Sequence, residues 1–243
     1  MALAGRNKQE AWDQWYTGRF NIKPFKGLSI KGDYSWNRYS ASRKVHRKEM
    51  TQTFPEGAAT WTVESPNYVQ NKNSNDIYQA LNVWAEYQKS FKNAHNMVLM
   101  AGYNQEQKTL ASTSYKMSNL YDNELPISDL AINYLENSET KDIWKVQGAF
   151  FRLNYDYQSK YLMEVNGRYD GSSKYAKDHR WAFFPSASVG WRISEEKFFK
   201  PLTKYVDNLK IRASFGALGN QVTEGYHDYM SYLCLLYTSD AAD

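Results

Sequence analysis

Charged side chains at alternate positions are the residues of this chain best placed to do chemistry. They fall in segments where every second residue is apolar: Arg152, Asp156, Glu164, Arg168, Arg192, Lys210 and Arg212. Residues two apart in a β-strand point to the same face, so each segment places its charges on one side. Such groups would hold water and hydrogen-bond a polar solute, or they would pair with one another across strands.

The chain contains no recognisable catalytic or metal-binding motif. Glu195 and Glu196 are neighbours that would point apart on a strand, and they instead predict the start of a short helix running to about Lys200. No glycine-rich phosphate loop or nucleophile elbow is present. The four histidines lack metal-ligand spacing: His46, His95, His179 and His227. We therefore expect no catalytic residue, no metal and no cofactor.

The composition points to strands with one apolar and one polar face. The chain has 243 residues, a formal charge of +4, 42% hydrophobic residues and 16% aromatic residues. The longest purely apolar stretch, Met97–Ala101, is far below the ~18 residues of a membrane-spanning helix. So many aromatic residues also argue against a disordered chain.

Period-2 alternation predicts about eight strands. Their approximate ranges are 10–23, 28–40, 76–90, 96–109, 144–157, 161–170, 181–193 and 209–216. Strands in globular proteins average about 5–6 residues, whereas a strand that crosses an outer membrane needs about 9–11. The predicted lengths favour the membrane.

The predicted connections alternate between short and long until the last pair, 171–180 and 194–207, which is ambiguous. Such alternation is typical of a transmembrane β-barrel. Residues 24–27, 91–95 and 158–160 form short turns, while 41–75 and 110–143 form long loops. Aromatic residues in the two long loops could stack on sugar rings, although such residues more often pack a loop on itself: Trp61, Tyr68, Tyr115 and Tyr121.

Alternation by itself leaves three interpretations open. A large barrel turns its polar residues into a water-filled lumen, whereas a soluble carbohydrate-binding β-sandwich turns them outward. A small closed membrane barrel acting as anchor or adhesin is the third interpretation. The basic run at 43–48 would be a solvated loop, or it would meet anionic lipopolysaccharide or an acidic solute. It is too short to indicate nucleic-acid binding.

An ordered series of motifs resembles the barrel of the SusC/RagA family, the TonB-dependent outer-membrane transporters typical of Bacteroidetes. The series covers about residues 144–221, and upstream segments fit more loosely. The motifs are Gly148–Tyr157 (GAFFRLNYDY), Lys160–Glu164 (KYLME), Arg168–Ser173 (RYDGSS), Arg180–Ser194 (RWAFFPSASVGWRIS), Leu209–Gly216 (LKIRASFG) and Gly219–Gln221 (GNQ).

The resemblance implies an all-β, antiparallel, up-and-down fold that forms part of a barrel of about 22 strands. It implies import of oligosaccharides or peptides across the outer membrane, driven through TonB and an N-terminal plug. A SusD-like surface lipoprotein would be the partner. The seven charged residues would then face the lumen, where they would pair with one another, contact the plug or contact the substrate.

The chain departs from the full family pattern. It shows no signal peptide, plug or TonB-contacting segment, so residues 1–233 are expected to be a partial barrel domain. Residues 234–243 resemble one reading frame of a sequencing adapter, and we expect this tail, with the single Cys234, to be non-native.

Overall fold

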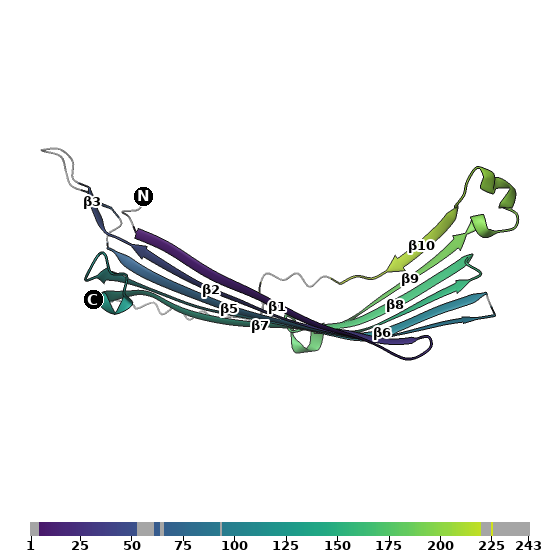
Figure 1. Ribbon diagram of the computed structural model, residues 1–243, viewed down its shortest axis with the longest axis horizontal. Helices are drawn as coiled ribbons and strands as arrows, with labels where there is room; N and C mark the ends of the chain where they lie inside the picture. Colours follow the sequence, from purple (N-terminus) through teal and green to yellow (C-terminus); the bar gives the residue numbers. More distant parts are fainter. Residues whose placement is uncertain (1–4, 53–60, 64–65, 93, 220–224, 226–243) are drawn as a thin grey trace, which may run out of the picture. The chain divides into compact units, whose positions relative to one another are not determined.

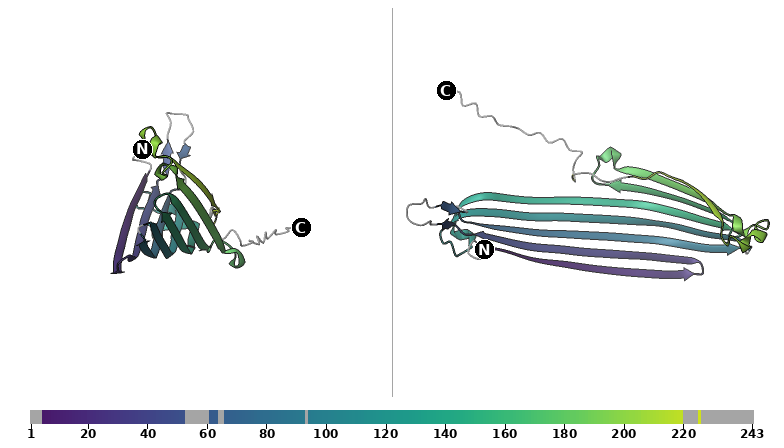
Figure 2. Two further views of the ribbon diagram at one scale, coloured as in Figure 1. Left: turned by 90° about the vertical axis from the view of Figure 1, so that its right-hand side faces the viewer. Right: turned by 90° about the horizontal axis from the view of Figure 1, so that it is seen from above.

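The computed structural model describes residues 5–52, 61–63, 66–92, 94–219 and 225. An eight-stranded sheet dominates these residues, and its strand order follows the chain (Figures 1 and 2). Its strands are β1 Gly5–Phe25, β2 Leu28–Arg47, β5 Tyr68–Phe91, β6 His95–Leu120, β7 Ala131–Tyr157, β8 Tyr161–Ser172, β9 Trp181–Arg192 and β10 Lys210–Gly216. Strands β3 Met50–Gln52 and β4 Trp61–Val63 pair separately. The all-β, up-and-down prediction is confirmed.

Strands β1 and β10 stand at opposite ends of the strand order. Within the described residues, β1 and β10 are therefore the two edge strands of the sheet as it is paired. The predicted tail at 234–243 lies outside the described residues.

Residue contacts divide the chain into two compact units. Unit 1 comprises residues 1–20, 32–81 and 106–143, and unit 2 comprises residues 21–31, 82–105 and 144–243. All seven predicted charged residues belong to unit 2, and the four predicted loop aromatics belong to unit 1.

Tight turns join the strand ends of unit 2 where the sequence predicts short connections. Gln158 and Ser159 both have positive φ, 52° and 58°, the backbone of a type I′ hairpin turn. The amide of Lys160 donates to the carbonyl of Tyr157 at 3.0 Å and closes this turn between β7 and β8. The turn between β1 and β2 also contains a residue with positive φ, Gly27 at 94°.

The register of β7 to β10 sorts their side chains onto two faces. Arg152 lies opposite Asn166 and Leu153 opposite Val165 on β8; Val165 in turn lies opposite Ala187 on β9. Odd-numbered residues thus share one face, which we call the apolar face, and even-numbered residues share the other, the polar face. Side chains of the apolar face stay exposed, for example Val189 at 57% and Ile211 at 58%. A soluble β-sandwich would bury such a face, and nothing among the described residues of unit 2 does so.

The prediction of two long loops, at 41–75 and 110–143, is largely wrong. Strand β2 continues to Arg47, β5 begins at Tyr68, β6 continues to Leu120 and β7 begins at Ala131. These extensions are rich in Ser, Thr and Asn on both faces, so they lack the apolar alternation that signals a strand. They are strands because their backbones pair with neighbouring strands, and backbone pairing cannot be read from the side-chain pattern.

Pro185 lies inside β9 without a bulge, because the register runs through it to Gly167 of β8. Its carbonyl accepts a hydrogen bond of 2.9 Å from Ala217. The N–H and C=O of one residue in an antiparallel strand point to the same neighbour, so the missing N–H faces β10. The ladder between β9 and β10 accordingly stops at Ser186 and Gly216.

In the part of the chain that the structure describes, the helical segments are short 3₁₀ turns: η2 Ser128–Leu130, η3 Lys177–His179, η4 Ile193–Glu195 and η5 Lys200–Lys204. The helix predicted between Glu195 and about Lys200 is replaced by η4 and η5. Among the described residues, no helix has the length and apolar character needed to cross a bilayer.

Candidate functional site

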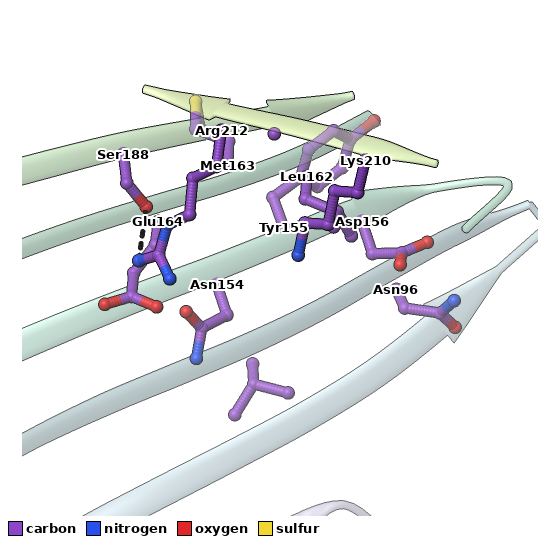
Figure 3. Close-up of a pocket in the computed structure, with 12 residues that line it drawn as sticks. Asn96, Asn154, Tyr155, Asp156, Leu162, Met163, Glu164, Ser188, Lys210 and Arg212 are labelled. Carbon is purple, nitrogen blue, oxygen red and sulfur yellow. Dashed lines mark hydrogen bonds between the residues drawn. The ribbon is translucent and has the colours of Figure 1, made fainter. Parts of the chain in front are cut away.

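The polar face of unit 2 carries a hollow of about 330 Å³ (Figure 3). Its floor consists of side chains from β6 to β10, as the close-up shows. Four of the seven predicted charged residues line it: Asp156, Glu164, Lys210 and Arg212. Asn96, Asn154 and Ser188 add neutral donors and acceptors. The hollow therefore offers both charge signs and amides to a polar solute.

Glycine in β9 makes room for the cations of this hollow. The Nη2 of Arg212 donates to the Oγ of Ser188 at 3.1 Å, the bond drawn in Figure 3. A Cβ at Gly190 would lie 3.2 Å from the Cε of Lys210. The glycine at position 190 thus leaves the space that the Lys210 side chain occupies.

A chain of hydrogen bonds crosses three strands of the polar face. The Nε of Arg152 on β7 donates to the Oδ1 of Asn166 on β8 at 2.7 Å. The Nδ2 of Asn166 donates to Glu164 at 2.8 Å and lies 3.3 Å from the Oγ of Ser186 on β9. Such connected polar groups hold one another in place.

Arg168 finds its partner on its own strand. Its Nε and Nη2 each lie 2.9 Å from an oxygen of Asp170, and Nη2 also lies 3.4 Å from Asn104 on β6. The guanidinium sits 5.9 Å from the ring centre of Phe150. A Cβ at Gly148 would overlap the Asp170 carboxylate, so this glycine accommodates the ion pair.

The register brings all seven predicted charged residues to one face. Arg192 lies directly opposite Lys210 on β10, so two like charges stand side by side. Asp156 also stabilises the β7–β8 turn, where its Oδ1 accepts the amide of Ser159 at 2.7 Å. Their roles toward a solute or a plug stay predictions.

Sequence reasoning missed the amides of this face: Asn96, Asn104, Asn154 and Asn166. They follow the same even-numbered alternation as the charged residues, and that signal would have found them.

The predicted loop aromatics do not form one group. Tyr68 begins β5 and Tyr115 lies within β6, so both are strand residues and the prediction of loop positions is wrong for them. Tyr68 lies under the Nζ of Lys116, 4.1 Å from its ring centre. Trp61 begins β4, and Tyr121, 90% exposed, is the one that follows a strand end.

A buried asparagine, also missed, ties the ends of β5 and β6 together in unit 1. Asn67 accepts the amide of Leu120 at 2.7 Å and donates to its carbonyl at 3.2 Å. Its Nδ2 also lies 3.3 Å from Asn123, which exchanges two bonds of 2.8 Å with the backbone of Glu49. Val69, Met117 and Leu120 form the buried apolar cluster beside this network.

Glu196 connects three residues at the start of β8 and the end of β9. Its carboxylate accepts from Tyr161 Oη at 2.8 Å, from Lys160 Nζ at 3.1 Å and from Trp191 Nε1 at 3.3 Å. The hydrogen bond from Tyr161 is the main reason that the pKa of Glu196 falls below its ordinary value, and the bond from Lys160 adds to it. Glu196 is thus a structural acceptor.

The described residues hold no group of three or more His, Cys, Asp or Glu side chains that could bind a metal. The arrangement is instead one of hydrogen-bonding groups on an open, water-accessible face.

Comparison with known sequences gives one consistent picture. The model of a family described as TonB dependent receptor-like, beta-barrel matches residues 3–228. The chain is 33% identical over 143 residues, 58% of its length, to TonB-dependent receptor P3 of Formosa agariphila, and it covers 14% of that protein. It is 46% identical over 72 residues, 30% of its length, to TonB-dependent receptor SusC of Bacteroides thetaiotaomicron, covering 7% of it.

A solved structure shares the fold. The chain superimposes on a chain of the RagAB peptide transporter with a TM-score of 0.81 and 17% sequence identity. The match covers 99% of this chain and 26% of that chain. The chain therefore spans about a quarter of its structural neighbour and less than a fifth of the curated relatives it matches.

Proposed function

Because the chain belongs to the TonB-dependent receptor-like β-barrel family, we propose that it forms part of the wall of an energy-coupled outer-membrane importer of the SusC/RagA type. Members of this family are transporters of the Gram-negative outer membrane, not enzymes. In the proposed assembly the polar face of β7 to β10 borders the water-filled lumen, and the apolar face meets acyl chains.

One observation carries this proposal. The cross-strand register gathers seven charged residues on one face of unit 2, while large apolar side chains on the other face remain exposed. Exposed apolar side chains are stable in contact with lipid, and polar ones are stable in a hydrated lumen.

The substrate class and partners follow from the same proposal. The hollow on the polar face, with cations, carboxylates and amides, suits an oligosaccharide or a peptide. TonB would act through a plug, and a SusD-like lipoprotein would cover the extracellular opening. The host would be a Gram-negative bacterium of the Bacteroidetes type.

Cysteine labelling tests the lumen assignment in the whole gene product. Ser188→Cys should react with a membrane-impermeant maleimide in outer-membrane vesicles, and Val189→Cys should not. The unsubstituted protein gives the background labelling. Equal labelling of both positions would refute the facing assignment.

Growth assays test the import function. A strain lacking the gene should lose growth on an oligosaccharide or a peptide mixture as sole carbon source, and a protonophore should abolish uptake in the parent strain. Unchanged uptake of both nutrient classes in the deletion strain would contradict an import role.

A further inference from the structure

A second hollow, of about 210 Å³, lies where the apolar face of unit 2 ends. Gln147 lies opposite Gly171, and Gly171 lies opposite Trp181, so these three form one row across β7, β8 and β9. The adjacent row contains Tyr169 and Phe183 and belongs to the exposed apolar face.

One aromatic side chain, Trp181, lines this hollow. The rings of Tyr169 and Trp181 stack with centroids 5.0 Å apart and planes inclined by 15°. A Cβ at Gly171 would lie 2.8 Å from atoms of the Trp181 ring, so this glycine lets the indole lie flat on the strand. Stacked amphipathic rings at the end of an apolar band are typical of a membrane interface.

Two cations, two amides and two serines form most of the remaining wall. Lys145, Arg180, Gln105 and Gln147 line the hollow, and no carboxylate does among the described residues. Two hydrogen bonds to Ser173 fix the backbone of Lys145. The amide of Lys145 donates to Ser173 Oγ at 2.9 Å, and its carbonyl accepts from the amide of Ser173 at 2.8 Å. Arg180 Nε donates to the carbonyl of Tyr175 at 3.0 Å.

The order of side chains along the strands matches the layers of one leaflet. Val165 and Val189 lie on the apolar face, Tyr169 and Trp181 follow, and Lys145 stands beyond them. Arg180 also lines a hollow on the polar face, so Lys145 is the cation that serves this site alone.

We propose that this hollow binds the phosphate group of an anionic lipid whose acyl chains lie along the apolar face. The inference rests on the proposed membrane position of that face. Lys145 and Arg180 would neutralise the phosphate, Gln105 and Gln147 would hydrogen-bond the headgroup, and Trp181 would cover the first acyl carbons.

Native mass spectrometry of the detergent-purified whole gene product tests this site. The probes are dioctanoyl phosphatidic acid, uncharged dioctanoylglycerol and inorganic phosphate. Unsubstituted protein should retain one phosphatidic acid, and should bind the other two at least about 10-fold more weakly. Equal affinity for inorganic phosphate would overturn the assignment to a lipid.

Substitutions locate the binding. The Lys145→Gln, Arg180→Gln double variant should lose about 10-fold in affinity for phosphatidic acid, and Trp181→Ala should also weaken it. Lys145→Arg should retain binding, as should the matched control Lys200→Gln on η5. Unchanged affinity in the double variant overturns the proposal.

Two readouts separate this inference from the proposed function. Heat-modifiable gel mobility reports barrel assembly, and uptake reports import; both should survive Lys145→Gln. Absence of the unsubstituted protein from the outer membrane would refute the proposed function itself. If the double variant does not fold, two other measurements test the site: the affinity of the single Lys145→Gln variant for phosphatidic acid, and a NaCl titration of the unsubstituted protein. If neither the substitution nor the salt weakens binding, the charge-based site is refuted.

Discussion

The hydroxyl of Tyr161 donates a hydrogen bond of 2.8 Å to the carboxylate of Glu196. This bond joins the first residue of β8 to the connection between β9 and β10. Because Lys160 and Trp191 donate to the same carboxylate, one side chain holds the connection against two strands.

The connection at 193–209 should loosen in acid. The pKa of Glu196 is lowered in the fold, first by Tyr161 and then by Lys160. A group with a lowered folded-state pKa stabilises the fold above its unfolded-state pKa, and this contribution is lost as pH falls through the folded-state pKa. Hydrogen exchange of 193–209, corrected for intrinsic rates, should therefore accelerate below about pH 4.5.

Two substitutions check that Glu196 is responsible. Glu196→Gln should show fast exchange at neutral pH and little further change in acid. The exposed neighbour Glu195 is the control, and Glu195→Gln should behave like the unsubstituted protein. A Glu196→Gln variant that keeps the acid response would contradict this account.

Arginine at adjacent positions of β9 should have opposite outcomes. Val189→Arg places a charge on the apolar face and should cost about 2–4 kcal/mol near the bilayer midplane. Ser188→Arg points into the polar hollow and should be tolerated. Folding titrations of the whole gene product in lipid vesicles measure the difference; equal stability of the two variants would exclude the proposed orientation.

Gly102→Ala should destabilise the sheet. Its Cβ would lie 2.8 Å from the carbonyl oxygen of Val83 and 2.6 Å from the Cβ of Trp84, and backbone atoms move only at a cost. We expect a loss of about 1–3 kcal/mol in the free energy of unfolding. Gly18→Ala in β1, where no atom lies within 4 Å, is the matched control and should not destabilise.

Asn67→Ala should destabilise unit 1. It removes both hydrogen bonds to the backbone of Leu120 and leaves buried polar groups unpaired, which costs about 1–3 kcal/mol. Asn73→Ala, at an exposed position of the same strand β5, should change stability by less than about 0.5 kcal/mol. Guanidinium unfolding of the two variants compares them, and a similar loss in both would disprove the role of Asn67.

The sequence predicts β8, β9 and β10 to within about two residues, because Trp181–Ile193 and Leu209–Gly216 alternate strongly between apolar and polar residues. It fails for the ends of β2, β5, β6 and β7 next to the predicted loops, where polar residues occupy both faces. The candidate site is predicted only in part. Arg152 and Glu164 follow from alternation, whereas the hydrogen bonds that connect Asn166 to Arg152 on β7 and to Ser186 on β9 depend on the register.

The two faces of β7 to β10 are determined by the sequence alone, since successive residues of any strand point to opposite sides. The partners within each face are decided by tertiary structure. Arg168 pairs with Asp170 on its own strand because its cross-strand neighbours are Phe150 and Phe184. A shift of register by two residues would keep every side chain on its face and exchange all its partners, so pairing depends on the turns and connections that set the register.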